Sequence, residues 1–276
     1  MKNIGTKIAA VAFLLLATPA FAGKGGSASK INSAIQSRSV DAIIAEVERT
    51  EGLNCGECVQ LITNLTEDDR YEVREVAAWW FAKRPAMAKM LAEGFVQDLG
   101  SGSSLAVRNA ADFLGATVTF TALPQMRSAI TRTDLNADAK LALVRAVKFM
   151  AHIDGNFVLL TAMGDADAQV RAAAANAWRE IRGQSSASPV VSLLADTDAT
   201  VRAEAATVVG AMLDATARPS LERLLTTDAS PIVRRNAAWA IGKLGQIASR
   251  DALYAATTDS SGLVRLTAKA ALATLR

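Results

Sequence analysis

Two stretches, DADAQVRAAAANAW at residues 165–178 and DASPIVRRNAAWA at residues 228–240, share one order of residue types. In each stretch an Asp comes first, a Val-Arg pair follows five and six positions later, and small apolar residues come next. The apolar residues recur every three or four positions, as in Val170, Ala174 and Ala177, which is the spacing of one helix face. Each stretch therefore predicts a helix that begins shortly after the Asp and buries an alanine-rich face.

The same pair recurs along most of the chain, and its last four copies are 31, 32 and 31 residues apart. A gap of 63 residues precedes them, and Ala139-Lys140 fills its midpoint. Such a period is typical of stacked structural repeats. The pairs are Val73-Arg74, Val107-Arg108, Val170-Arg171, Val201-Arg202, Val233-Arg234 and Val264-Arg265. We therefore expect about seven copies over residues 67–276, the last one incomplete.

Each copy begins and continues in the same way. Residues that commonly cap helix N-termini stand four positions before the Arg or Lys, and a second, shorter helical pattern follows, as in SPVVSLLAD at 188–196. Two helices cannot bury their apolar faces alone, so the copies must stack. The expected caps are Ser104, Asn136, Asp167, Asp198, Ser230 and Ser261. We predict an all-α fold, a right-handed α-solenoid of stacked antiparallel helix pairs with repeats of about 31 residues.

The pattern D-x-D/S-x-x-V-R-x-x-A-A-x-A resembles the HEAT-like repeat of phycobilisome-lyase-type proteins. The resemblance covers about three quarters of the chain and implies a solenoid of helix pairs. It implies little about function, because such repeats serve scaffolds, adaptors, inhibitors and a few lyases alike.

An Asp stands six positions before the Arg or Lys in six of the seven copies, and Gly102 replaces it in the other. In the family that these copies resemble, the loop Asp and the helix Arg form a hydrogen-bonded ladder between neighbouring repeats. A calcium site at pairs such as Asp165 and Asp167 is the alternative, but it needs six or more oxygen ligands and the usual loop motif is absent. We therefore interpret these residues as a structural ladder and expect no metal site. The ladder comprises Asp68, Arg74, Arg108, Asp134, Lys140, Asp165, Arg171, Asp196, Arg202, Asp228, Arg234, Asp259 and Arg265.

The first residues, MKNIGTKIAAVAFLLLATPAFAG, show the order of a secretory signal peptide. Lys2 and Lys7 precede a short apolar run, and small residues follow it, so we predict a signal peptide over 1–22 with cleavage after Ala22. No later stretch has the roughly 20 apolar residues that a spanning helix needs, and an uncleaved N-terminal anchor is the alternative. We expect a periplasmic or secreted protein with no membrane span in its mature form.

The only two cysteines, Cys55 and Cys58, lie in NCGEC at 54–58. We predict a flexible linker over 23–38, which is rich in Gly, Ser and Lys at first, and a capping helical pair over 39–66 with the cysteines at its turn. In an oxidising compartment a local disulfide is expected there. The competing hypothesis is a thiol-disulfide or electron-transfer role, because a helix N-terminus can lower a thiol pKa. Val59 stands where covalent haem attachment needs a His.

Catalytic and cofactor motifs are scarce in this sequence. The single histidine, His152, is interpreted as a helix-end or packed residue, and no common nucleophile, metal or phosphate-binding motif occurs. We therefore predict a protein that is not an enzyme and has no cofactor. Trp79 and Trp80 are adjacent, so one helix cannot bury both; the exposed one is a candidate partner-binding residue.

The formal net charge is +3 and falls to +1 without Lys2 and Lys7, which gives no indication of a nucleic-acid partner. The leading hypothesis is a non-enzymatic periplasmic scaffold or adaptor, monomeric on its own, that binds a protein partner on the solenoid surface, mainly through the second helices. A component of a larger envelope assembly is a further possibility.

Overall fold

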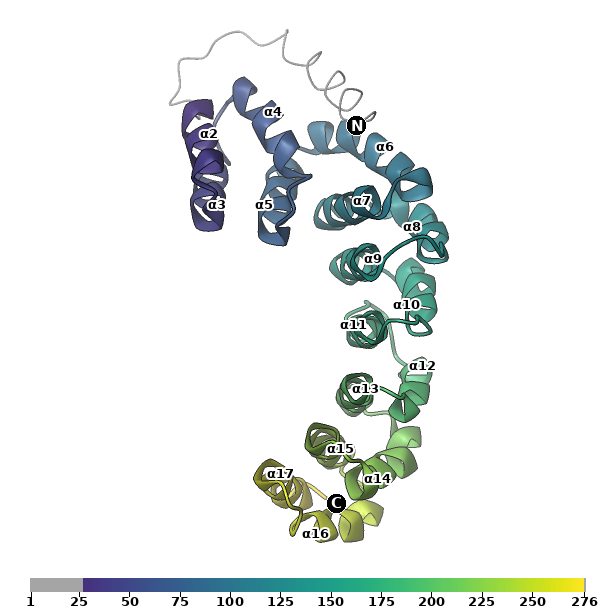
Figure 1. The fold of residues 1–276 in the computed structure, drawn as a ribbon. Helices are drawn as coiled ribbons and strands as arrows, with labels where there is room; N and C mark the ends of the chain where they lie inside the picture. Colours follow the sequence, from purple (N-terminus) through teal and green to yellow (C-terminus); the bar gives the residue numbers. More distant parts are fainter. Residues whose placement is uncertain (1–26, 276) are drawn as a thin grey trace. The chain divides into compact units, whose positions relative to one another are not determined.

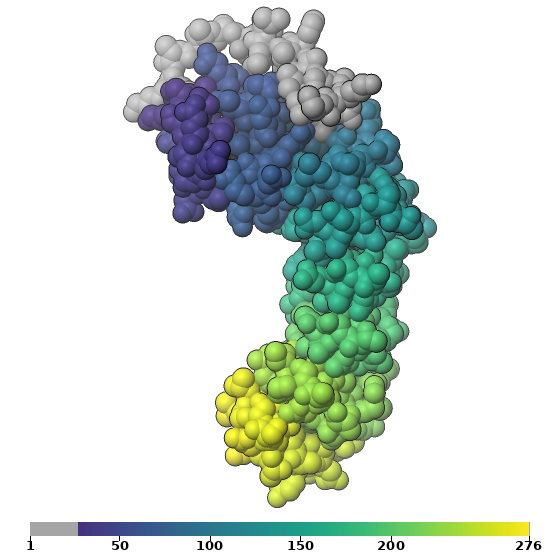
Figure 2. Space-filling view, in the orientation of Figure 1, coloured from purple at the N-terminus to yellow at the C-terminus, as the bar shows by residue number. Residues whose placement is uncertain are grey.

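The computed structural model describes residues 27–275, and every regular element in that range is an α-helix or a short 3-10 helix (Figure 1). The chain forms two compact units, the first ending at Met150 and the second beginning at Ala151. Figure 2 shows that, within each unit, segments that follow one another in sequence lie next to one another in space. The fold is an α-solenoid, as the repeat predicted.

The first unit contains eight α-helices in its described part. The helices α5, α7 and α9 lie side by side, each containing a Val-Arg pair or its Ala-Lys variant near its start, and α6 and α8 form the second layer (Figure 1). The elements are α2 (Ala28–Ser37), α3 (Val40–Arg49), α4 (Gly56–Leu65), α5 (Tyr71–Ala82), α6 (Pro85–Ser101), α7 (Ser104–Ala116), η2 (Phe120–Ala122), α8 (Leu123–Ile130) and α9 (Ala137–Met150).

The second unit repeats the same arrangement, with α11, α13, α15 and α17 as the first helices of its copies (Figure 1). The second helices are shorter and several begin with a 3-10 turn. The elements are η3 (Ile153–Gly155), α10 (Asn156–Ala162), α11 (Ala168–Trp178), α12 (Ser188–Val191), η4 (Ser192–Ala195), α13 (Ala199–Ala211), η5 (Ala215–Ala217), α14 (Arg218–Thr227), α15 (Pro231–Leu244), η6 (Ile247–Ser249), α16 (Arg250–Ala256) and α17 (Gly262–Leu272).

The helix starts follow the capping pattern only in part, because Ser230 and Ser261 stand at the N-caps of α15 and α17 but their side chains make no capping hydrogen bond. Asp167 accepts hydrogen bonds from the backbone N–H groups of Gln169 and Val170, and Asp198 caps α13 in the same way. Ser104 was expected to cap α7, but the cap is Ser103, whose hydroxyl accepts from the Ala106 N–H at 3.3 Å. Serine occupies both positions, so the residue types alone do not decide between them.

Neighbouring first helices approach closely because one carries a glycine where the next carries an alanine. A Cβ atom added at Gly115 in α7 would lie 2.6 Å from the Ala146 Cα in α9, and one at Gly210 in α13 would lie 2.7 Å from the Ala240 Cα in α15. No side chain larger than hydrogen fits at that distance without moving the backbone. The alanine-rich faces therefore set a short helix spacing within each unit.

The linker prediction is wrong for residues 28–37, which form α2. The Ser27 hydroxyl caps this helix by accepting from the Lys30 N–H, and Ile31 and Ala34 are buried against α3 and α4. The apolar contacts outweigh the Ser-rich composition that suggested a linker. The N-terminal cap of the array is therefore three helices, of which α3 and α4 are the predicted pair.

The predicted signal peptide over 1–22 and the first linker residues lie outside the described residues. Within residues 27–275, no helix combines the length and the apolar character needed to cross a membrane.

Candidate functional site

The second unit contains a continuous run of arginine–aspartate pairs. Arg171 donates two hydrogen bonds to the Asp196 carboxylate, at 2.8 and 2.7 Å, and its third nitrogen donates to the Asp165 and Ala166 carbonyls at 2.8 and 3.0 Å. Each guanidinium therefore joins the loop of its own copy to the loop aspartate of the next. The hydrogen bonds from Arg171 hold the pKa of Asp196 below its usual range.

The next two steps of this ladder have the same geometry. Arg202 pairs with Asp228 at 2.7 and 3.1 Å, and Arg234 pairs with Asp259 at 2.8 and 2.9 Å. Arg265 donates to the Asp259 and Ser260 carbonyls, which are in its own loop. Asp165 accepts from the Asp167 N–H at 2.9 Å.

In the first unit, Arg74 reaches a helix residue instead of a loop aspartate. One guanidinium nitrogen donates hydrogen bonds to the Asp68 and Asp69 carbonyls, at 2.7 and 2.8 Å. The other two nitrogens donate to the Asp112 carboxylate in α7, at 3.0 and 2.7 Å. The loop position opposite Arg74 is Gly102, which has no carboxylate. Asp112, ten positions after Gly102 and inside α7, supplies the missing acceptor.

Asp112 also accepts two hydrogen bonds from Arg145 of α9, at 3.0 and 2.6 Å, and its side chain is only 2% exposed. Sequence reasoning missed both residues. A signal was present, because Asp112 stands five positions after Val107, where three of the four copies of the second unit have the buried alanines Ala175, Ala206 and Ala238. An acidic residue on an otherwise alanine face indicates a buried partner.

The structure does not bring all predicted ladder residues of the first unit together. Asp68 pairs with Arg70 and Asp134 with Arg132, each two positions away, while the Arg108 guanidinium donates to Asn109 and lies 3.5 Å from the Asp69 carboxylate. Lys140 lies in the first turn of α9. The regular ladder of the second unit is thus replaced here by several local pairs.

The two adjacent tryptophans have different environments. Trp80 is 1% exposed, its indole N–H donates to the Thr50 hydroxyl at 3.0 Å, and Arg84 stacks 3.4 Å from its ring centroid. Trp80 is therefore a core residue, which corrects its assignment as a candidate for partner binding. Trp79 is partly exposed on the other side of α5, with the Lys83 ammonium 5.4 Å from its ring centroid.

Trp79 lines a surface groove of about 380 Å³ within the first unit, which we call the glutamate–tryptophan groove. All of its lining residues come from α3, α5, α7 and α9, so it lies on the first-helix layer rather than on the second helices. Phe149 at its far side is 52% exposed. The lining residues are Ile44, Glu48, Glu72, Glu75, Val76, Trp79, Ala116 and Phe149.

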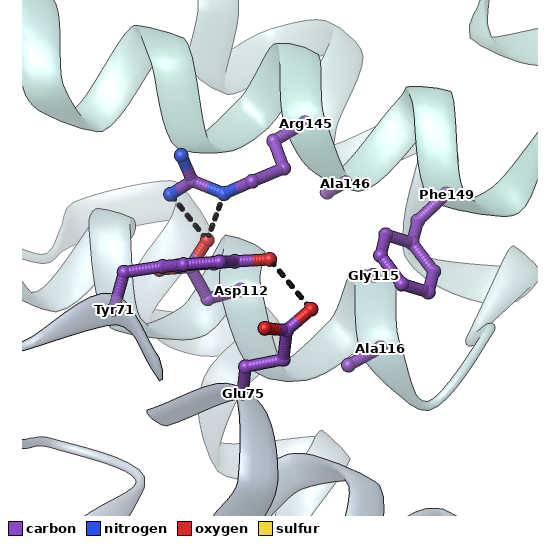
Figure 3. Close-up of a pocket in the computed structure, with 8 residues that line it drawn as sticks. All are labelled: Tyr71, Glu75, Asp112, Gly115, Ala116, Arg145, Ala146 and Phe149. Carbon is purple, nitrogen blue, oxygen red and sulfur yellow. Dashed lines mark hydrogen bonds and ion pairs between the residues drawn. The ribbon is translucent and has the colours of Figure 1, made fainter. Parts of the chain in front are cut away.

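A second, much smaller pocket adjoins this groove, and Figure 3 shows its lining residues. The Tyr71 hydroxyl donates to Glu75 at 3.0 Å, and the Arg145 guanidinium lies 4.2 Å above the Tyr71 ring centroid while it bonds Asp112. Burial, with the Glu75 charge adding to it, raises the pKa of the Tyr71 phenol well above its usual range. Tyr71 therefore keeps its proton and holds one Glu75 oxygen in place.

These contacts connect the buried charges to the groove. Glu75, Ala116 and Phe149 line both the small pocket and the groove. The chain of contacts runs from Asp112 through Arg145 and Tyr71 to Glu75. The groove wall is therefore supported by two sets of hydrogen bonds, Arg145–Asp112 and Tyr71–Glu75, joined by the cation–π contact between Arg145 and Tyr71.

Cys55 and Cys58 lie as a close pair with their Cα atoms 5.2 Å apart, within the range that a disulfide allows. Cys55 is the N-cap of α4, and its sulfur accepts from the Cys58 N–H at 3.2 Å. Cys58 is fully buried, whereas Cys55 is partly exposed.

His152 precedes η3, and its Nδ1 accepts from the Asp154 N–H at 3.2 Å. Over the part of the chain that the structure describes, no group of three or more His, Cys, Asp or Glu side chains is arranged to hold a metal ion.

The helical layers and the arginine–aspartate ladder define an α-solenoid protein with HEAT-like repeats. Residues 187–273 match the family described as HEAT repeats. A comparison with curated proteins found no match.

Solved structures with a similar fold include the X-ray structure of YibA from Escherichia coli, at a TM-score of 0.58 and 15% identity over 99% of this chain and 97% of that one. The structure of human deoxyhypusine hydroxylase in complex with glycerol has a TM-score of 0.39 and 19% identity over 89% of this chain and 96% of that one. The structure of the CpcE–CpcF complex of phycocyanin lyase from Nostoc has a TM-score of 0.42 and 17% identity over 78% of this chain and 86% of that one. The similarity to YibA supports the solenoid fold.

Proposed function

We propose that this protein is a non-enzymatic, exported interaction scaffold that binds a protein partner through the glutamate–tryptophan groove. The observation that carries the proposal is Trp79, an indole left partly exposed beside the half-exposed Phe149 in a groove of about 380 Å³. Exposed aromatic side chains in a concave site are typical binding anchors. The sequence of residues 1–22 supports export.

The buried charges support a scaffold role because they are satisfied by one another. Asp112 accepts four hydrogen bonds from two arginines, and the arginines of the second unit join successive loops. Such saturated pairs stabilise a surface and hold its shape.

Site-directed photocrosslinking tests this proposal. A photoreactive benzoylphenylalanine at position 79 should give a discrete adduct with one envelope protein in the native cell, and Phe149→Ala should weaken it. The same group at Glu93, an exposed residue of α6 outside the groove, serves as the control. No adduct from position 79, or the same adducts from both positions, would refute a groove-bound partner.

A thiol-disulfide role for Cys55 and Cys58 is the alternative, and one observation favours it. A partly exposed sulfur at a helix N-terminus beside a buried one is an arrangement that can activate a thiol. The reduction potential of the pair separates the two roles. A value below about −300 mV indicates a structural bond, and a value near those of the thiol oxidants would support the redox role.

A further inference from the structure

We infer that the glutamate–tryptophan groove recognises a cationic segment of its partner, one that presents a Lys or Arg side chain next to an apolar residue. This inference rests on the proposed function and adds the chemistry of the partner. It follows from the charges of the groove, from its aromatic surface and from the contacts that hold its side chains in place.

Three of the groove's lining residues are glutamates, and no lining residue is cationic. Within residues 27–275, no side chain donates a hydrogen bond to, or forms an ion pair with, the carboxylate of Glu48 or Glu72. Arg70, whose charge lies near Glu72, is held by Asp68 at 2.8 Å. Two carboxylates are therefore available on adjacent helices, α3 and α5, and they complement a positive ligand.

The third glutamate is held in a defined position. Glu75 accepts from the Tyr71 hydroxyl at 3.0 Å through one oxygen, which leaves the other to a ligand. Tyr71 is itself held by Arg145 above its ring, and Arg145 by the buried Asp112. A carboxylate fixed before binding loses little freedom when a ligand arrives, which favours affinity.

The aromatic and aliphatic lining fits the rest of such a segment. The Trp79 ring lies beside the glutamates and already faces a cation, the Lys83 ammonium at 5.4 Å. Lys83 also pairs with the exposed Glu51 at 3.2 Å. A ligand cation can therefore bind over the indole while Lys83 keeps Glu51 as its partner. Ile44, Val76 and Phe149 provide the contact for a neighbouring apolar side chain.

The extent of the groove favours a polypeptide over a small amine. Its lining comes from four helices, and Ile44 and Phe149 belong to the two outermost of them, α3 and α9. A compact amine would reach the glutamates alone. A polypeptide segment can place a cation at the glutamates and an apolar side chain at Phe149 at the same time.

Fluorescence anisotropy with defined peptides tests the inference. The probe is a fluorescein-labelled peptide that repeats Lys-Leu-Ser, and its counterpart repeats Glu-Leu-Ser at the same length. The purified protein should bind the lysine peptide and not the glutamate peptide, and added salt should weaken binding because exposed charges are screened. Glu48→Gln with Glu72→Gln should reduce affinity about fivefold, which corresponds to about 1 kcal/mol.

Matched variants control for general charge and aromatic content. Glu57→Gln with Glu93→Gln removes two exposed carboxylates from α4 and α6, outside the groove, and should change affinity less than about twofold. Trp239 has the same place in its copy as Trp79, with Lys243 at 5.8 Å from its ring. Trp79→Ala should weaken binding and Trp239→Ala should not. Circular dichroism would verify that each variant is folded.

Three results would overturn the inference. They are equal binding of the two peptides, equal effects of the groove and control variants, and spermidine binding as tightly as the lysine peptide. The last result would assign the groove to a small amine. If position 79 still crosslinks to one partner while the peptide results are negative, the cationic segment is wrong and the proposed scaffold role stands. If the crosslinking fails, the scaffold role itself fails.

Discussion

Asp112 occupies a buried position that is alanine in three of the four copies of the second unit, and two arginines converge on it. A carboxylate in such surroundings is stable only because both guanidiniums are present, and Arg74 is in turn buried with a side chain that is 4% exposed. One buried carboxylate is thus paired with two arginines, from helices α5 and α9.

Asp112→Ala restores the alanine of the repeat pattern but leaves Arg74 buried without its carboxylate. We expect a loss of about 3–5 kcal/mol in the free energy of unfolding, measured by urea denaturation. Asp134→Asn, which removes a more exposed partner of Arg132, should cost less than about 1 kcal/mol. Asp112→Ala combined with Arg74→Met should recover much of the loss. A double variant as unstable as the single one would show that the charge pairing is not the cause.

The ladder aspartates make stability depend on pH in the acidic range. Hydrogen bonds from Arg171 and Arg234 lower the pKa of Asp196 and Asp259 respectively in the folded protein. Because the folded pKa lies below the unfolded value of about 3.9, their contribution is complete above that pH and is lost as the pH falls through the folded pKa.

The difference in unfolding free energy between the natural protein and Asp196→Asn should therefore be largest near neutral pH. It should shrink as the pH is lowered below about 4, as measured by urea denaturation across a pH series. A difference that is the same at neutral pH and at the lowest pH where the protein stays folded would contradict this origin.

At the scale of the helix, close packing depends on the glycine–alanine contacts between first helices. Gly210→Ala would place a methyl group 2.7 Å from the Ala240 backbone and push α13 away from α15. We expect a loss of about 1–3 kcal/mol by urea denaturation, despite the better helix propensity of alanine. Gly100→Ala in α6 is the control, because nothing lies within 4 Å of the added atom, and it should not destabilise the protein. Equal losses for both variants would contradict the packing argument.

The cysteine pair belongs to the α2–α4 cap, and its replacement should act locally. Cys55→Ser with Cys58→Ser should increase hydrogen exchange in α2, α3 and α4 and leave α7 and α13 unchanged. A bond closing so short a loop stabilises a chain less than a long-range one, so the change in global stability should be small. Faster exchange throughout the first unit would indicate a larger role.

The repeat pattern predicted the helices that follow local rules. Asp167 and Asp198 form the expected caps, and the Val-Arg spacing places α11, α13 and α15 within a few residues. Helix α2 was missed because its Ser- and Lys-containing sequence is polar on most sides, and only Ile31 and Ala34 reveal burial. The average composition of α2 is polar and hides its two buried apolar residues, whereas the packing of the helix depends on those two positions alone.

The site was harder to predict than the helices, because it is assembled from distant residues. Ile44 and Phe149 meet in one groove across more than a hundred positions of sequence, and no local pattern relates them. The sequence predicted that one of Trp79 and Trp80 is exposed, but the choice depends on Thr50, which bonds the Trp80 indole from the C-terminal end of α3.

At the scale of the whole molecule, the candidate site and the regular ladder belong to different compact units. Arg202→Met breaks a ladder step in the second unit and should lower unfolding free energy by about 2 kcal/mol or more. Affinity for the Lys-Leu-Ser peptide should stay within about twofold of the natural protein, because every groove residue lies in the first unit. A parallel loss of peptide affinity in the folded variant would show that the site requires the second unit.

The ladder of the second unit has a direction, since Arg171, Arg202 and Arg234 each bond their own loop and the aspartate of the following copy. A duplicated segment of 31 or 32 residues inserted in frame brings one arginine and one aspartate, so both new junctions close with the native bonds. An insertion of half that length leaves an arginine and an aspartate without partners. Gene duplication can therefore lengthen this array one whole copy at a time. A partial insertion is disfavoured because it destabilises the fold by leaving an arginine and an aspartate unpaired.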